Sequence, residues 1–369
     1  MKKNNGVDPY TDFIQTAPVQ YINRKDSLQE SGKFVNQWGG KCLISTGKKA
    51  WRAAGEKIEA SLAEHGLSYD RMSFSGECCE QNVEKIVQKA EETDADLIIG
   101  VGGGKSIDTA KAAADFFKVP VVTIPTIAAT CASTSPISVM YNKKGEFQRN
   151  LYLKNNPNLA IVPPRVIAEA PTKYIQAGIL DSFAKWYEGR TVFPKLDSPS
   201  LFASSSFELS KLLNEKLKKE AAETVRLVKS NQVGPSLIEV TNVILFLTGV
   251  IQSLGQSENR GAAAHAVHNG LTVLEESHDL LHGIKVGYGI LVHLILEDRP
   301  ESEIRNTVSL FQELEMAPSL EKLGLPNDDK HLSAVAEKAV DDMLMDHMPF
   351  DVTPRMVEGA MRKLEDMMK

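Results

Sequence analysis

The feature that most constrains the fold of this 369-residue chain is a change of pattern at Pro163 and Pro164. Before it, short apolar runs rich in β-branched residues alternate with amphipathic stretches. The runs are expected to be strands at 41–45, 71–74, 96–101 and 119–124, and the stretches helices at 50–64, 80–92 and 106–117. This alternation predicts a mainly parallel sheet covered by helices.

After the two prolines the pattern becomes helical through to Met368. We therefore predict an α/β domain over residues 1–163 and an all-helical domain over residues 164–369. A hydrophobic content of 42% and a charged content of 24% are typical of a soluble globular protein with a sizeable core.

Charge and apolar runs limit the class of partner. The formal net charge is −6 and the basic residues are scattered, so neither nucleic acid nor an anionic membrane surface is expected as a partner. Residues 1–9 lack the apolar core of a signal peptide, and the longest apolar run, 243–251, is too short to span a bilayer. A cytoplasmic location is expected, with reduced thiols at Cys42, Cys78, Cys79 and Cys131.

A glycine-rich turn, Gly102-Gly103-Gly104-Lys105, lies between an expected strand and an expected helix. Consecutive glycines let backbone approach a ligand closely, and the amides at a helix start attract an anion. Lys105 favours a bound phosphate, because a cation at a helix N-terminus otherwise opposes the helix dipole. The turn departs from the Rossmann fingerprint, whose third glycine is replaced by Ile107, and a merely flexible turn is the alternative.

Half of the eight histidines fall in one stretch, at His265, His268, His278 and His282. Neutral imidazole binds zinc and other divalent metals, and catalytic sites commonly use three protein ligands and one open position. The spacing differs from that of the zinc proteases, so a further ligand must come from elsewhere. His278, in a polar segment, is expected to be exposed.

An ordered set of motifs resembles the glycerol dehydrogenase branch of the iron-containing alcohol dehydrogenases, nearly end to end. The motifs are Gly-Gly-Gly-Lys-Ser-Ile-Asp-Thr-Ala-Lys at 102–111, Pro-Thr-Ile-Ala-Ala-Thr at 125–130, Ala-Gly-Ile-Leu-Asp at 177–181, Ala-His-Ala-Val-His-Asn-Gly at 264–270 and His-Gly-Ile-Lys-Val at 282–286. The resemblance implies the architecture of the dehydroquinate synthases: a Rossmann-like nicotinamide-binding domain, and a helical domain that holds a divalent metal. It also implies a homo-oligomer.

By this resemblance the metal ligands are Asp181, His265 and His282, with zinc favoured and iron or manganese as alternatives. The apolar surroundings of Asp181 agree, because a carboxylate without a partner is costly there. The competing interpretation is a hydrogen-bonded core aspartate and ordinary surface histidines. His268, one turn beyond His265, is expected to contact substrate or relay a proton.

The resemblance also assigns the cofactor site. The pyrophosphate is expected at Gly103, Gly104 and Lys105, and the residues on the nicotinamide side are Thr126, Ser135, Ile137 and Tyr141. After the 41–45 strand the family often has an aspartate that binds the adenine ribose. Here the chain reads Thr46-Gly47-Lys48-Lys49, which has no carboxylate and two cations, so NADP is favoured over NAD at Gly47 and Lys48.

A second departure concerns the substrate. The family's Thr-Asp-Ala-Pro segment, whose aspartate contacts polyol hydroxyls, is replaced by Thr130-Cys131-Ala132-Ser133. Cys131 is interpreted as a small packing residue, since no neighbour in the sequence lowers the pKa of its thiol. Lys185 lies one helical turn after Asp181 and so faces the same side, where it can bind a substrate carboxylate. A lysine with a buried stem and a solvated head is the alternative.

With these departures the chain resembles the hydroxycarboxylate dehydrogenases, which interconvert 2-oxo and 2-hydroxy acids. We therefore predict a metal-dependent oxidoreductase that moves hydride between NAD(P)(H) and a small substrate, with 2-oxo acid reduction as the main hypothesis. The alternatives are a glycerol or polyol dehydrogenase, a dehydroquinate synthase-like lyase and a catalytically silent ligand-binding homologue.

Overall fold

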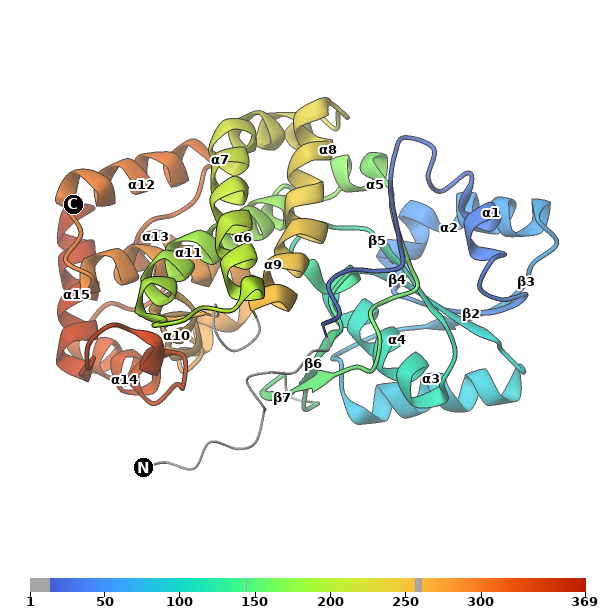
Figure 1. Cartoon of the computed structure of the whole chain (residues 1–369), viewed down its shortest axis with the longest axis horizontal. Coiled ribbons are helices and arrows are strands. Elements are labelled where there is room, and N and C mark those ends of the chain that lie inside the picture. The colour runs from blue at the N-terminus through green and yellow to red at the C-terminus, as the bar shows by residue number, and fades with distance from the viewer. Residues whose placement is uncertain (1–13, 144, 256–260) are drawn as a thin grey trace.

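The computed structural model describes residues 14–143, 145–255 and 261–369, and they form an α/β half and a helical half that lie side by side (Figure 1). The extreme N-terminus, on which the absence of a signal peptide was predicted, lies outside the described residues. The strands are β1 Gln20–Asn23, β2 Lys41–Thr46, β3 Ser68–Ser73, β4 Leu97–Gly102, β5 Val121–Pro125, β6 Ile137–Tyr141, β7 Phe147–Tyr152 and β8 Leu159–Val162.

The main sheet has six strands, all parallel, in the order β1-β8-β5-β4-β2-β3. The helices between them are α1 Ser31–Val35, α2 Lys48–Glu64, α3 Glu80–Glu92 and α4 Gly104–Phe117. The predicted parallel sheet with covering helices is confirmed, and the predicted elements are found within a few residues of their expected ends.

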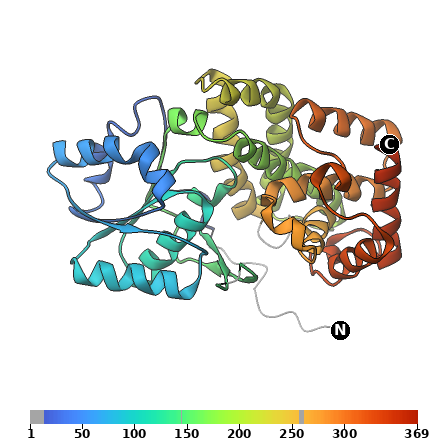
Figure 2. The ribbon, with the colours of Figure 1, turned by 180° about the vertical axis from the view of Figure 1, so that it is seen from behind.

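Alternate side chains of the central strands build a core on each face of the sheet. Ile44 and Ile99 pack with α2 on one face, while Leu43 and Ile98 pack with α3 and α4 on the other. Burial on both faces explains why these strands are continuous apolar runs. Figure 2 shows the two helical layers from behind.

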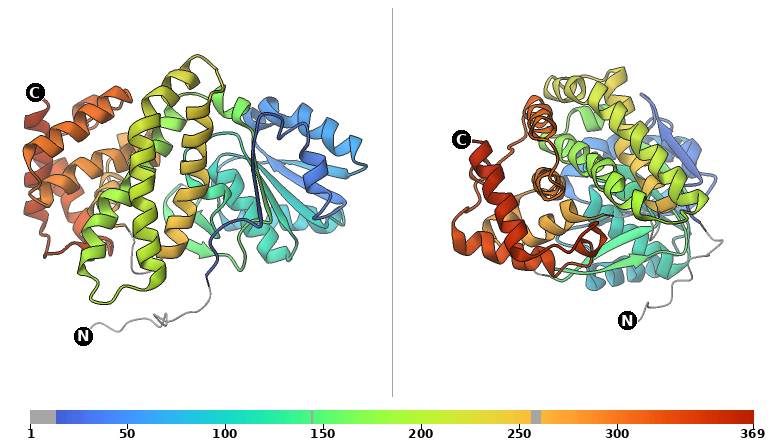
Figure 3. Two further views of the ribbon diagram at one scale, coloured as in Figure 1. Left: turned by 45° about the horizontal axis from the view of Figure 1, so that its top comes forward. Right: turned by 60° about the vertical axis from the view of Figure 1, so that its left-hand side comes forward.

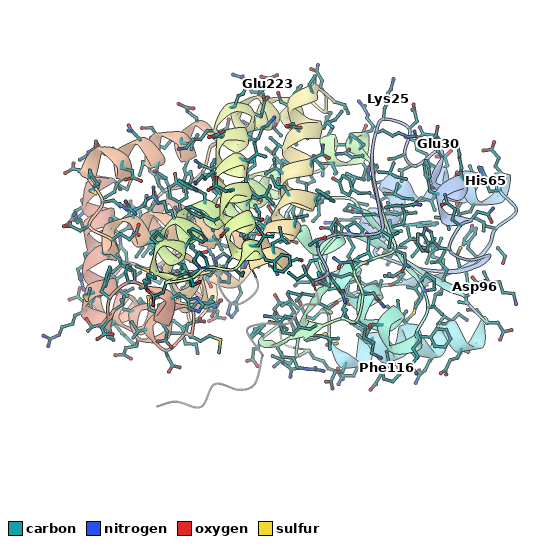
Figure 4. All side chains as sticks on the ribbon, viewed as in Figure 1. Lys25, Glu30, His65, Asp96, Phe116 and Glu223 are labelled. Carbon is teal, nitrogen blue, oxygen red and sulfur yellow. The ribbon has the colours of Figure 1, made fainter. Side chains whose placement is uncertain are left out.

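Asp96 marks the amino end of the strands. Its carboxylate accepts hydrogen bonds from the amides of Gly40 and Lys41, at 2.8 to 3.0 Å, and ties the start of β2 to that of β4. In Figure 4 Asp96 lies on the side of the molecule far from the helical half. The carboxyl ends of the parallel strands therefore point toward the helical half, where ligands bind in sheets of this kind.

An antiparallel hairpin of β6 and β7 was not predicted. It follows β5 and the short 3-10 helix η1 Cys131–Ser133, and its register shifts between Met140 and Tyr141. The exposed residues of β7 lack the period-two apolar pattern of a half-buried strand, which removes the usual sequence signal.

The helical half contains the remaining described elements, which Figure 3 shows from two further directions. They are α5 Pro164–Ala168, α6 Lys173–Val192, η2 Phe193–Lys195, α7 Leu201–Lys229, α8 Pro235–Asn242, η3 Val243–Leu247, α9 Thr248–Gly255, α10 Ala263–Leu271, η4 Glu275–Asp279, α11 His282–Leu296, α12 Glu301–Glu313, α13 Leu320–Leu323, α14 Asp329–Val340, η5 Met345–His347 and α15 Pro354–Met367. Every described strand precedes Pro164. The division into two domains at this point stays a prediction.

The helices α8, η3 and α9 form one continuous helix, Pro235–Gly255, in which η3 is a π-helical turn. This helix is long enough and apolar enough to cross a membrane. The run 243–251, from which no spanning segment was expected, is only a part of it. Half of its most apolar 18-residue segment is buried inside the protein, and the helix packs against α7. Such burial is expected of a helix in the core of a protein.

Candidate active site

The three predicted metal ligands lie together in the helical half. Oδ1 of Asp181 is 3.1 Å from Nε2 of His282 and 3.6 Å from Nε2 of His265, and the three ligand atoms all lie within 4.8 Å of one another. Asp181 is buried on α6, whereas the His282 side chain, at the start of α11, is 42% exposed. The cluster is thus accessible from the side of His282.

Close helix packing produces this convergence. A Cβ atom at Gly283 would lie 1.9 Å from the carbonyl oxygen of Ala177, and one at Gly289 would lie 2.2 Å from that of Ala264. Only glycine permits such contact, so α11 lies directly against the backbones of α6 and α10. These contacts place His282 beside Asp181 and His265.

Glu188, two helical turns after Asp181, holds His265 from the opposite side of its ring. Its Oε2 is 2.7 Å from Nδ1 of His265, and its Oε1 accepts hydrogen bonds from the amides of His265 at 3.0 Å and Ala262 at 2.7 Å. A carboxylate only accepts, so Nδ1 carries a hydrogen, and Nε2 is the ring nitrogen that faces the cluster. This is the usual support for a metal-binding histidine.

The pKa values reflect the concentration of charge. Burial opposes ionisation of Asp181, but the charge of His282 and the hydrogen bonds from both imidazoles hold the pKa of that carboxyl well below its usual range. Burial likewise opposes ionisation of Glu188, yet His265 lowers its pKa to about 2. Both acids are therefore anions at neutral pH, and their combined charge favours a cation between the rings.

The donor set fits a divalent metal of the zinc type. Two imidazole nitrogens and one carboxylate oxygen are ligands that zinc accepts, and a tetrahedral site separates its ligand atoms by about 3.4 Å. The separations from Asp181 to the two histidines bracket that value. Since only these three side chains converge among the described residues, a fourth position is left for water or substrate.

His268 lies behind His282 and is buried. Its Nε2 is 3.0 Å from Nδ1 of His282, and its Nδ1 is 2.8 Å from Oδ1 of Asn269. Both ring nitrogens are engaged, so the geometry favours a role for His268 in orienting His282. The predicted contact with substrate or proton relay stays a prediction. His278 is exposed, as expected.

The glycine-rich turn follows β4 at the carboxyl edge of the sheet. Gly102 has φ of +148°, a conformation that favours glycine, and its carbonyl accepts from the amide of Thr126 at 3.0 Å. Gly103 precedes α4 and Gly104 begins it, so their amides are at the helix start, where phosphates bind. Lys105 forms an ion pair with Glu77 at 2.5 Å, so a bound phosphate would share its ammonium group with this carboxylate.

A buried lysine of α4 holds the segment predicted to line the nicotinamide. Nζ of Lys111 donates to the carbonyls of Ser135 at 2.9 Å and Ile137 at 2.6 Å, and it pairs with Asp108 at 2.9 Å. Tyr141, at the end of β6, is partly buried, which raises its pKa to about 12. The helix that starts at the glycine turn thereby sets the position of Ser135 and Ile137.

The segment predicted to meet the adenine ribose lies next to this turn. Gly47 precedes α2, Lys48 begins it, and Lys48 and Lys49 are exposed. Ala50 lies close to Gly102, since a Cβ at Gly102 would be 3.7 Å from that of Ala50. The starts of α2 and α4 are therefore neighbours, as one dinucleotide requires.

The residues proposed to recognise substrate also lie near the cluster. Lys185 shares a face of α6 with Asp181, is half-buried, and acts electrostatically on Asp181 and on the thiol of Cys131. Burial raises the pKa of Cys131 to about 11, so it is a neutral packing residue rather than a nucleophile. Its sulfur lies 3.9 Å from Oε1 of Gln252, a residue of α9.

The sequence analysis missed several residues of this site. Glu188 could have been found from its spacing, because it follows Asp181 by two turns and so lies on the same face of α6. Gln252, Asn269 and Asp342 carry no such signal, since only the tertiary structure brings them to the site. All four cysteines are free and buried, which agrees with the predicted reduced thiols.

Comparison with known proteins identifies the family. A family model described as iron-containing alcohol dehydrogenase matches residues 18–164. A glycerol dehydrogenase of Pseudomonas putida is 35% identical over 94% of this chain and 95% of its own length, and hydroxycarboxylate dehydrogenase A of Escherichia coli is 32% identical over 95% and 97%. The crystal structure of glycerol dehydrogenase from Schizosaccharomyces pombe superposes with a TM-score of 0.87 at 30% identity, covering 96% of this chain and 91% of that one. This chain therefore belongs to the iron-containing alcohol dehydrogenase family, in its glycerol dehydrogenase-like branch.

Proposed function

We propose that this protein is a metal-dependent oxidoreductase that moves hydride between a nicotinamide cofactor and a short substrate with oxygens on neighbouring carbons. The observation that carries the proposal is the convergence of Asp181, His265 and His282 in a cluster accessible from one side. The first substrate candidate is a polyol such as glycerol, which the name of the glycerol dehydrogenase relative supports.

When bound, the metal supplies Lewis-acid chemistry that polarises the substrate oxygen. The chain supplies the rest of the site. Glu188 and His268 orient the two histidine ligands, and the amides of Gly103 and Gly104 bind the pyrophosphate. Lys111 positions the segment of Ser135 and Ile137 against the nicotinamide.

The second substrate candidate is a 2-oxo acid, the main hypothesis from the sequence. Two residues favour it: Lys185 places a cation one turn from Asp181, and Cys131 stands where the glycerol dehydrogenase pattern has a carboxylate. The name of the hydroxycarboxylate dehydrogenase relative is in line with this reaction. We place it second because several of the most similar relatives are glycerol dehydrogenases.

For the cofactor we propose NADP(H) over NAD(H), since Gly47, Lys48 and Lys49 offer cations and no carboxylate to a 2′-phosphate. For the metal we propose zinc, with iron or manganese as alternatives. We also propose that the enzyme is a cytoplasmic homo-oligomer that acts on a small molecule, without nucleic acid or membrane as partner.

One substrate panel tests the proposal. Zinc-loaded enzyme is incubated with glycerol, short aldehydes or 2-oxo acids, each with the reduced or oxidised forms of both cofactors, and net cofactor turnover is followed by absorbance. Metal-dependent turnover supports the proposal, and the preferred substrate decides between the two candidates. Conversion of a substrate without net cofactor turnover would indicate a dehydroquinate synthase-like lyase. Lack of both metal binding and turnover would indicate a silent ligand-binding homologue.

A further inference from the structure

A chain of side chains runs from the metal cluster into the helical half. Nδ1 of His282 lies 3.0 Å from Nε2 of His268, whose Nδ1 lies 2.8 Å from Oδ1 of Asn269. The amide nitrogen of Asn269 donates to Oδ2 of Asp342 at 2.6 Å, and Oδ1 of Asp342 accepts from the amide of Leu344 at 2.9 Å. Both ends of the Asp342 carboxylate are thus engaged.

The direction of each hydrogen bond follows from the chemistry of its groups. A carboxylate only accepts, so Asp342 must face the NH2 group of Asn269, and the Asn269 carbonyl must face His268. That carbonyl accepts only, so the hydrogen of His268 is on Nδ1. The lone pair of His268 Nε2 then accepts from Nδ1–H of His282, so Nε2 of His282 is the nitrogen that faces Asp181. Without a metal this nitrogen donates a hydrogen to the carboxylate, and a metal between them would take the place of that hydrogen.

We infer that Asp342 and Asn269 are positioning residues that select the metal-binding tautomer of His282 through His268. The inference rests on the proposed function, because it assumes that the cluster of Asp181, His265 and His282 holds a metal. Partners of this type around metal ligands typically change metal affinity by about 10- to 100-fold when they are mutated.

The substitution Asp342→Asn reverses the direction of the hydrogen bonds between residue 342 and His282. The new amide keeps its oxygen on the amide of Leu344, so its NH2 group faces Asn269. Asn269 must then turn its carbonyl toward position 342 and its NH2 toward His268. The hydrogen of His268 moves to Nε2, and His282 is left with its hydrogen on Nε2, where the metal binds.

The experiment measures zinc affinity of the metal-free full-length enzyme by competition with a chromophoric chelator. Asp342→Asn should bind zinc about 10- to 100-fold more weakly than the wild type. In the double variant Asn269→Asp/Asp342→Asn, the carboxylate at position 269 again accepts from His268, and the amide at position 342 donates to that carboxylate. This variant should therefore recover most of the affinity. The control is Asp341→Asn, whose side chain is 82% exposed at the protein surface and should leave the affinity unchanged.

A second measurement does not depend on the variants folding. Nitrogen-15 NMR of the zinc-loaded wild type should show the hydrogen of His282 on Nδ1 and that of His268 on Nδ1. The opposite tautomers would overturn the inference, as would a zinc affinity of Asp342→Asn equal to that of the wild type, or a double variant that recovers nothing. If the wild type itself binds no zinc, the proposed metal site fails, and this result differs from each of the others.

Discussion

Oε2 of Glu188 lies 2.7 Å from Nδ1 of His265, on the side of the ring opposite to Asp181. Its other oxygen accepts hydrogen bonds from backbone amides at the start of α10, so the carboxylate is held at both ends. Glu188 therefore fixes the orientation of a metal ligand without belonging to the ligand set.

The first prediction follows from this contact. Glu188→Gln should weaken zinc binding by about 10- to 100-fold, because a neutral amide no longer demands a hydrogen on Nδ1 of His265. Zinc competition with a chelator measures the change. Glu223→Gln is the matched control, since Glu223 lies on the outer surface of α7, paired with Arg226 (Figure 4). Equal affinities of both variants would show that Glu188 does not support the site.

The metal ligands themselves are the second prediction. His265→Ala or His282→Ala should abolish turnover and metal binding but leave the binding of nucleotide to the α/β half intact, because the two sites use different elements. Fluorescence titration with the reduced cofactor measures the binding. Treatment with a chelator should reproduce the loss of turnover, and full activity of the metal-free enzyme would contradict the metal site.

The third prediction concerns the packing of α11 against α10. Gly289→Ala should destabilise the protein by about 1–3 kcal/mol, because the added Cβ would lie 2.2 Å from the carbonyl oxygen of Ala264. Denaturant unfolding measures the change. Gly359→Ala, at an exposed position of α15 where a Cβ meets nothing within 4 Å, should instead be neutral or stabilise by up to about 1 kcal/mol. Similar effects of the two changes would argue against the close contact.

The cofactor preference is the fourth prediction. Gly47→Asp should weaken NADPH binding and favour NADH, because a carboxylate at the start of α2 repels a 2′-phosphate and accepts from a free ribose hydroxyl. The ratio of kcat/KM for the two cofactors measures the shift. Ser68→Asp adds the same charge at the amino ends of the strands, opposite to the carboxyl ends where α2 and α4 start, and should leave the ratio unchanged. A wild type that prefers NADH would contradict the proposal.

The fifth prediction separates the two substrate candidates. Lys185→Met should lower kcat/KM for 2-oxo acids by about two orders of magnitude, because it leaves a substrate carboxylate desolvated and without a partner. A neutral aldehyde should be affected much less. Lys173→Met, at the exposed start of α6, is the control. Equal losses on acid and aldehyde would place Lys185 in a structural role, and robust glycerol oxidation by the wild type would favour the polyol candidate.

The sequence by itself determined the centre of the α/β half, because burial on both faces of the sheet leaves a clear apolar signal in β2, β4 and β5. Helix α3, Glu80–Glu92, begins and ends where it was predicted, and β2, β4 and β5 differ only at their ends. The ligand residues Asp181, His265 and His282 were also predicted from the sequence, since the motifs around them resemble a known family.

Only the tertiary structure decided how those ligands meet and what supports them. Asp181 and His282 are 101 residues apart, and their contact depends on helices that approach backbone to backbone at glycines. Asn269 and Asp342 are 73 residues apart, in segments with no shared pattern. Local patterns encode which face of a helix is buried, but they do not encode which distant polar groups will share that face, because this depends on the packing of the whole chain.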